Sequence, residues 1–137
     1  MDSFFTFIVE NFIAFSFLII LVVVLIIYEG KKGGKRIDPA ELTRLLNREE
    51  GTVIDLRNER EFSSGHISGA QNIEPNKIDE QLNSKKISKE KPIVLVCKTG
   101  SNSTIVGGKL KKLGFKNINI MSGGMMVWQN QGLPLSK

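Results

Sequence analysis

The chain has 137 residues with a single cysteine and a formal net charge of +5 at pH 7. This length allows one domain of ordinary size, and one cysteine excludes an internal disulfide and suits a reducing compartment. All 19 basic residues and 11 of the 14 acidic residues follow residue 30, so residues 31–137 carry a net charge of +8. Because the lysines are scattered and are not interleaved with aromatic residues, they indicate a solvated surface and no nucleic-acid partner.

Residues 12–28, FIAFSFLIILVVVLIIY, form an apolar run that only Ser16 interrupts. As a helix, a run of this length covers roughly 26 Å, close to the ~30 Å hydrocarbon core of a bilayer. The alternative is a cleaved signal peptide, which has a basic start and a small-residue cleavage site. This segment instead carries Asp2 and Glu10 and leads into EGKKGGKR. We therefore expect residues 1–30 to be a single-pass membrane anchor that spans the bilayer at about 12–28.

Basic residues flank this run only on its carboxyl side. Segment 31–37 is rich in glycine and basic residues, and we expect it to be a short, flexible linker. The positive-inside rule then places the N-terminus outside and the following domain in the cytoplasm. The basic side chains of the linker would lie against anionic lipid headgroups, each contributing about 1 kcal/mol. They are Lys31, Lys32, Lys35 and Arg36.

The remaining residues, 38–137, carry alternating helix and strand patterns. The first helix begins at 38, with Asp38 as N-cap, Pro39 in the first position and Glu41 completing a capping box. A polar, turn-rich stretch occupies 58–73. Strand–helix alternation indicates an α/β domain with a mainly parallel sheet. The expected strands are 52–57, 92–97 and 117–121, and the further helices are about 75–83, 103–114 and 123–132.

Cys97 lies at the end of the most apolar of these strands, and Lys-Thr-Gly-Ser-Asn-Ser follows it. In open parallel sheets, ligands bind beyond the carboxyl ends of the strands. A loop containing Gly100 can direct several backbone N–H groups at the sulfur, and together with the start of the next helix they would stabilise an anion. We therefore favour Cys97 as a thiolate nucleophile that can bear a persulfide. The alternative is a buried cysteine that only fills volume.

Three blocks within residues 38–135 resemble a single-domain rhodanese, a sulfurtransferase family, of the membrane-anchored bacterial type. They are VIDLRNEREFSSGHISGAQNI, then CKTGSNS after IVLV, and MSGGMMVWQNQGLPL. The resemblance implies a small five-stranded, mainly parallel sheet flanked by helices over residues 38–137. The positive-inside rule then places this domain on the cytoplasmic side of the bacterial inner membrane. The resemblance also implies that Cys97 accepts sulfane sulfur as a persulfide and passes it to a thiophilic acceptor without a cofactor. The substrate-binding residues would be Lys98, Thr99, Gly100, Ser101, Asn102 and Ser103.

Asn102 departs from the family pattern, in which a basic residue often ends the six-residue loop. An amide cannot replace a guanidinium that binds an oxyanion in bidentate fashion. A protein persulfide or a small persulfide is therefore favoured over thiosulfate as the donor, although Lys98 could supply a positive charge. Cysteine-dependent phosphatases need an arginine at the position of Ser103, so we do not expect phosphatase activity.

Several other residues invite a catalytic interpretation, but a structural one is favoured. His66 could form a dyad with the cysteine, yet it lies in a turn-like stretch. Asp55 and Arg57 are expected to fix a turn, and a chain with one histidine and one cysteine is not expected to bind a metal. Met125, Met126 and Trp128 are expected in the core. The glycine pairs 107–108 and 123–124 suggest close packing against the sheet and a backbone bend near the Cys97 loop, respectively.

Two functions remain open on the sequence alone. The first is a membrane-tethered sulfurtransferase or sulfur carrier that uses Cys97. The second is a catalytically weak binding module that recruits a protein partner at the inner membrane. Asn102 and the lack of an obvious acceptor site favour the second, whereas the position of the cysteine favours the first. We expect the first.

Overall fold

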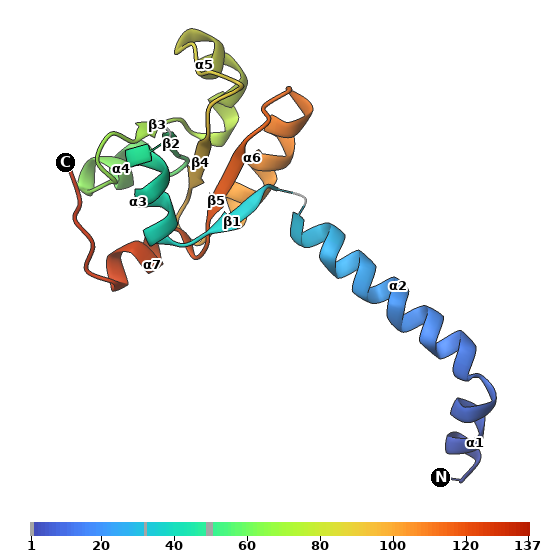
Figure 1. The fold of residues 1–137 in the computed structure, drawn as a ribbon. Helices are drawn as coiled ribbons and strands as arrows, with labels where there is room; N and C mark the ends of the chain where they lie inside the picture. Colours follow the sequence, from blue (N-terminus) through green and yellow to red (C-terminus); the bar gives the residue numbers. More distant parts are fainter. Residues whose placement is uncertain (1, 32, 49–50) are drawn as a thin grey trace. The chain divides into compact units, whose positions relative to one another are not determined.

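The computed structural model describes residues 2–31, 33–48 and 51–137, without the side chains of 29–31. The chain divides into two compact units, residues 1–31 and 32–137. Figure 1 shows the helical first unit in blue and the second unit, which contains the sheet, in the remaining colours.

The first unit consists of two helices, α1 (Asp2–Glu10) and α2 (Phe12–Lys31). The chain bends by 75° between them, where the Asn11 side chain donates to the carbonyl oxygen of Phe7 at 2.8 Å. The large side chains of Phe12–Tyr28 are apolar and mostly exposed. Within the described part of the chain, no single helix is long and apolar enough to cross a membrane. By length and composition, the bent pair together meets that requirement.

The second unit is built on a five-stranded sheet in which every described pair of neighbours is parallel. The strand order is β1-β5-β4-β2-β3, which places β4 at the centre. The expected α/β class and five-stranded sheet are therefore confirmed, and the sheet is wholly rather than mainly parallel. The strands are β1 (Lys35–Ile37), β2 (Thr52–Asp55), β3 (Gln71–Asn72), β4 (Ile93–Val96) and β5 (Ile118–Met121).

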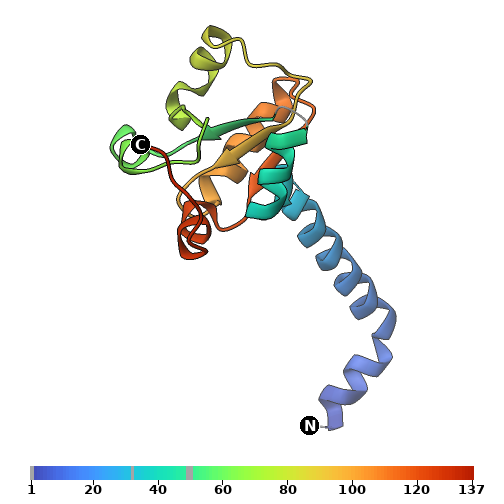
Figure 2. The same ribbon diagram turned by 60° about the vertical axis from the view of Figure 1, so that its left-hand side comes forward.

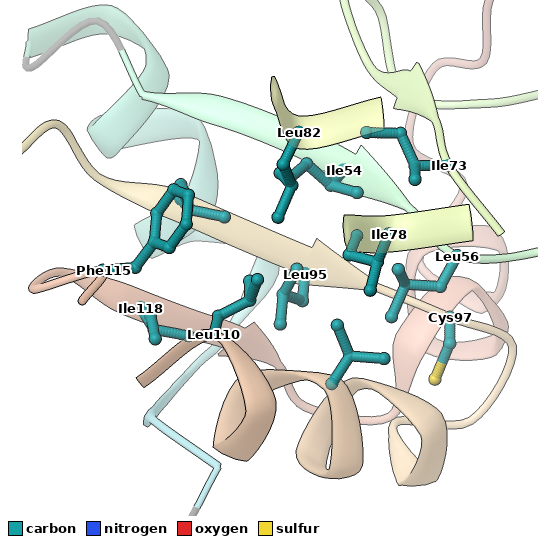
Figure 3. Packing of buried hydrophobic residues seen from close by; sticks show 12 residues of the cluster. Ile54, Leu56, Ile73, Ile78, Leu82, Leu95, Cys97, Leu110, Phe115 and Ile118 are labelled. Atoms are coloured by element: carbon teal, nitrogen blue, oxygen red, sulfur yellow. The ribbon is translucent and has the colours of Figure 1, made fainter. Parts of the chain in front are cut away.

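Helices cover both faces of this sheet, as Figure 2 shows. Two hydrophobic clusters lie between the layers. One joins β4 and β5 to α5 and α6 through residues such as Leu82, Leu95 and Leu110 (Figure 3). The other joins the opposite sides of the same strands to α3 and α7 through residues such as Leu42 and Trp128. The helices of this unit are α3 (Pro39–Arg48), α4 (Glu59–Ser64), the short 3₁₀ helix η1 (Pro75–Lys77), α5 (Ile78–Ser84), α6 (Ser101–Lys112) and α7 (Gly124–Asn130).

The first helix of this unit forms for the reason that its sequence indicates. The Glu41 N–H donates to Asp38 Oδ1 at 2.8 Å, and the Leu42 N–H donates to the Asp38 carbonyl at 3.0 Å. Asp38 therefore satisfies backbone donors that a helix start leaves unpaired. Pro39 occupies the first helical position, where its missing N–H has no cost. The predicted N-cap is confirmed.

The segment expected as a flexible linker differs from that expectation. Residues 35–37 form β1, in which Ile37 pairs with Met121, and both Gly33 and Gly34 are buried. Lys35 and Arg36 are exposed, and Arg36 Nη2 donates to Thr104 Oγ1 at 3.1 Å. Of the four expected lipid contacts, Lys32 and the side chain of Lys31 lie outside the described residues.

The polar stretch 58–73, expected to be turn-rich, contains α4 and β3. Asn58 caps α4, because its Oδ1 accepts from the Glu61 N–H at 2.8 Å. β3 is held on the edge of the sheet by Asn72, whose side chain donates to the carbonyls of Asp55 and Arg57 at 3.1 and 2.8 Å. A helix of six residues and a strand of two are too short to show a recognisable periodicity in the sequence.

Candidate active site

Cys97 directly follows β4, every residue of which is buried. The side chain of Cys97 is 2% exposed and belongs to the cluster that includes Leu56 and Val106. Figure 3 shows Cys97 at the edge of this cluster, beyond the end of β4, with its sulfur beside the first turn of α6. The sulfur is therefore at the carboxyl edge of the sheet, where ligands bind in open parallel folds.

A tight loop brings the start of α6 to this sulfur. Gly100 has a φ of 103°, in the left-handed region that favours glycine, and its N–H donates to Cys97 Sγ at 2.9 Å. The Gly100 carbonyl accepts from the N–H and the hydroxyl of Thr104 at 3.3 and 3.2 Å. The Gly100 N–H and the start of α6, a helix of 12 residues, are therefore both beside Cys97 Sγ.

The predicted loop is shorter than expected, because α6 begins at Ser101 and not near Ser103. Lys98, Thr99, Ser101 and Asn102 are exposed, whereas Gly100 and Ser103 are buried. The hydroxyls of Thr99 and Ser101 lie 3.3 Å apart. Ser103 Oγ is fully buried and has no hydrogen-bond partner among the described residues.

The start of α7 supports the loop from the other side. The Met125 N–H donates to the Cys97 carbonyl at 2.8 Å, and the Met126 N–H donates to the Lys98 carbonyl at 3.2 Å. Gly124 has a φ of 59°, and a Cβ atom there would collide with the Cys97 carbonyl oxygen. The glycine pair 123–124 thus allows the close approach of the two segments, as the sequence suggested.

A pocket of about 220 Å³ adjoins the loop. Its walls come from the loop, from α4 with the residues before it, and from α7, and Cys97 itself is not among them. Sequence reasoning missed the α4 wall because that helix was not predicted, and it placed Met126 in the core, whereas Met126 is exposed. Met125 and Trp128 are buried as expected. The lining residues are Arg57, Glu61, Ser64, Lys98, Met125, Met126 and Gln129.

Asp55 and Arg57 form a buried ion pair at the edge of this pocket. Arg57 Nη2 lies 2.8 Å from Asp55 Oδ2 and also donates to the Gly65 carbonyl at 2.8 Å, and Arg57 Nε donates to Asp55 Oδ1 at 3.0 Å. These contacts tie the end of β2 to the end of α4. The pair therefore fixes a turn, as predicted.

His66 makes contacts that fit a structural role. Its ring stacks on Phe62 with a centroid separation of 3.8 Å, and its Nδ1 lies 2.9 Å from the Phe62 carbonyl. Its backbone forms an antiparallel bridge with Ser136, which fastens the end of the chain. His66 therefore contacts α4 and the C-terminal segment. The hydrogen bond described for Cys97 Sγ is donated by the Gly100 N–H and not by the His66 ring.

Comparison with known proteins agrees with this arrangement. A model of the rhodanese-like domain family matches residues 38–131. The protein YibN of Escherichia coli K12 is 33% identical over 102 residues, which cover 74% of this chain and 71% of YibN. GlpE of Pseudomonas putida, a thiosulfate sulfurtransferase, is 27% identical over 95 residues, which cover 69% of this chain and 84% of GlpE.

The fold is also similar to that of solved structures. The polysulfide-sulfur transferase homodimer of Wolinella succinogenes superposes with a TM-score of 0.67 at 29% identity, over 77% of this chain and 80% of that one. The family match covers more than half of the chain, and strands β2 to β5 and the loop after β4 lie within it. The chain therefore belongs to the rhodanese-like domain family.

Proposed function

We propose that this protein is a membrane-tethered sulfurtransferase or sulfur carrier in which Cys97 takes up sulfane sulfur and passes it to a thiophilic acceptor. The observation that carries the proposal is the 2.9 Å contact from the Gly100 N–H to Cys97 Sγ at the start of α6. A backbone donor and a helix start both favour a negatively charged sulfur. The thiolate is the form of cysteine that attacks another sulfur.

The transfer is a thiol exchange at sulfur. The Cys97 thiolate attacks the outer sulfur of a donor persulfide, the S–S bond of the donor breaks, and the donor leaves as a thiolate. Cys97 then carries the transferred sulfur as a persulfide, whose anion the loop and the start of α6 would hold as they hold the thiolate. The acceptor thiolate repeats the exchange in the opposite sense, so no oxidant or cofactor is needed.

The residues at the start of α6 favour a persulfide or polysulfide donor over thiosulfate. Asn102 is exposed in the first turn of α6, where a neutral amide offers no charge to a sulfonate. Lys98 is the cationic side chain that directly follows Cys97. We propose Lys98, Thr99, Gly100, Ser101, Asn102 and Ser103 as the residues that surround the bound sulfur.

Intact mass spectrometry tests the proposal directly. After incubation with polysulfide, the full-length chain should gain about 32 Da, the mass of one sulfur atom added as a persulfide. A reductant should remove the added mass, and Cys97→Ser should not acquire it. Failure of polysulfide, thiosulfate and a protein persulfide to give this adduct would exclude sulfur transfer by this chain.

The membrane tether rests on α1 and α2. A helix that is apolar on every side needs either a protein core or lipid around it, and the large side chains of α2 are exposed. We propose that residues 1–30 anchor the protein in the bacterial inner membrane with the N-terminus outside and residues 38–137 in the cytoplasm. The basic residues after α2 would contact anionic lipid on that side. Alkaline extraction of cell membranes should leave the full chain in the pellet and release a chain that lacks residues 1–30.

A second candidate function is recruitment of a protein partner at the membrane. It is favoured by the 2% exposure of Cys97 and by the lack of a charged group at Asn102. Cys97→Ser separates the two functions. If this variant retains full biological activity while removal of residues 1–30 abolishes it, recruitment is the function. If Cys97→Ser abolishes activity, sulfur transfer is required.

A further inference from the structure

We propose that the pocket between the Cys97 loop, α4 and α7 binds a zwitterionic α-amino-acid thiol, of which cysteine is the simplest, as the acceptor of sulfur from Cys97. Glu61 would bind its ammonium group and Lys98 its carboxylate. This inference rests on the proposed function and names the class of its acceptor.

The pocket begins one residue from the nucleophile. Lys98 lines it and directly follows Cys97, so the two Cα atoms are about 3.8 Å apart. The Met125 N–H donates to the Cys97 carbonyl, and the Met125 side chain lines the same pocket. An acceptor seated here would therefore lie against the segment that carries the persulfide.

The charges that line the pocket select a zwitterion. The guanidinium of Arg57 is engaged by both carboxylate oxygens of Asp55 and by the Gly65 carbonyl, so its charge is compensated within the protein. Glu61 and Lys98 remain, one of each sign. A dianion would meet one favourable and one unfavourable charge there, whereas an amino acid presents one matching group to each.

Glu61 is available for an ammonium group. Its backbone N–H is taken by Asn58 Oδ1 at 2.8 Å and its carbonyl by the Ser64 hydroxyl at 2.7 Å, which fixes the backbone. The hydrogen bond described for its carboxylate, from Asn58 Nδ2 to Oε1, is 3.5 Å long. Such a long contact is weak, so the carboxylate can accept from a ligand without losing a strong partner.

The size and the remaining lining also suit a small thiol. A volume of about 220 Å³ is smaller than the roughly 300–1,000 Å³ of sites for drug-sized ligands. Met125 and Met126 contribute polarisable thioether groups to its wall. In the transfer, the acceptor thiolate attacks the outer sulfur of the Cys97 persulfide, the Cys97 S–S bond breaks, and the products are the acceptor persulfide and the Cys97 thiolate.

Matched acceptors test the recognition. Full-length protein in detergent is first loaded from polysulfide, and the adduct of about 32 Da is quantified by intact mass. Its loss is then timed at one pH with cysteine, with 3-mercaptopropionate, which lacks the ammonium, and with cysteamine, which lacks the carboxylate. The intrinsic reactivities of the three thiols cancel when the ratio of two rates is compared between a variant and the native chain.

Glu61→Gln should lower the ratio of the cysteine rate to the 3-mercaptopropionate rate by roughly threefold to tenfold, the net value of one typical hydrogen bond at a solvent-accessible site. Lys98→Gln should lower the ratio of the cysteine rate to the cysteamine rate by a similar factor. Glu59→Gln on the same helix and Lys112→Gln at the end of α6 make the same charge changes outside the pocket, and they should leave both ratios as they are.

Two results would overturn the inference, and they are distinguishable. If the adduct forms but Glu61→Gln and Lys98→Gln leave both ratios unchanged, the pocket does not recognise an amino acid, and the sulfurtransferase function stands. If no adduct forms in the loading step, the proposed function fails and the acceptor site fails with it.

Discussion

Gly33 lies so close to Gly107 of α6 that a Cβ atom on Gly107 would collide with the Gly33 carbonyl oxygen. Gly33 is constrained in turn, because a Cβ atom there would lie 2.6 Å from the carbonyl oxygen of Thr104. Since Gly33 precedes β1 by two residues, this contact holds the start of the domain against α6. Glycine within a helix costs about 1 kcal/mol relative to alanine, and the close approach explains why α6 contains one here.

Gly107→Ala should therefore destabilise the domain. We expect a loss of about 2 kcal/mol in the free energy of unfolding, because overpacking costs more than the gain in helix propensity returns. Urea unfolding of the full chain in detergent, followed by the fluorescence of Trp128, measures the change. Gly51→Ala is the control, since its Cβ atom would have its nearest neighbour at an ordinary 3.5 Å. Equal stabilities of the two variants would contradict the close contact.

Removal of one partner of the buried Asp55–Arg57 ion pair should lower the free energy of unfolding more than Gly107→Ala does. Asp55→Asn leaves the charge of Arg57 buried without its counterion, and we expect the free energy of unfolding to fall by about 3–5 kcal/mol. Glu41 and Arg44 form a matched surface pair, 3.2 Å apart with side chains 33% and 59% exposed. Glu41→Gln should cost less than about 1 kcal/mol, because an exposed pair is screened by water. Similar losses in the two variants would show that burial does not set the strength of the Asp55–Arg57 pair.

The central strands could be predicted from the sequence because burial on both faces leaves a continuous apolar run, as in Ile93–Val96. The edge strands could not. Lys35–Ile37 has only three residues with two of them charged, and it is a strand because Met121 and its neighbours, more than 80 residues later, offer backbone partners. Gln71–Asn72 likewise depends on β2 for its pairing. Pairing between distant segments leaves no periodicity in either one.

The nucleophile could be placed at the edge of the sheet because Cys97 marks the point where an apolar strand meets a polar loop. The pocket beside it could not, because it combines side chains of α4 and α7 with Lys98. Those segments are about 30 residues to either side of Cys97 in the chain. Gly123 and Gly124 indicated a backbone bend near the Cys97 loop, and Gly124 does approach the Cys97 carbonyl. The meeting of α4 with α7 also depends on the register of the parallel strands, which no local pattern reveals.

Replacing Ser103 by alanine should not destabilise the fold. A buried hydroxyl without a partner costs roughly 1–3 kcal/mol, and Ser103 Oγ has none among the described residues. Ser103→Ala should leave the free energy of unfolding unchanged or raise it by up to about 1 kcal/mol. Asn58→Ala shows the sensitivity of the urea assay, because the loss of the α4 cap should cost about 1 kcal/mol. A loss as large for Ser103→Ala would reveal a partner for its hydroxyl.

Replacing Asn102 by arginine should allow Cys97 to take sulfur from thiosulfate more readily. Asn102→Arg places a guanidinium in the exposed first turn of α6, where it can bind two oxygens of a sulfonate. Loading of Cys97 from thiosulfate should become roughly tenfold faster, the value of about 1.4 kcal/mol of added binding. Loading from polysulfide, which has no sulfonate oxygens, should not gain by the same factor.

The control for Asn102→Arg separates recognition from simple attraction. Ile105 is 73% exposed on the same helix, so Ile105→Arg adds an equal charge less than one turn further along α6. If the guanidinium must bind thiosulfate through two hydrogen bonds, only Asn102→Arg should accelerate loading, and the acceleration should persist at high salt. If both variants accelerate loading equally and added salt removes the gain, long-range attraction explains it, and the identity of residue 102 does not decide which donor is used.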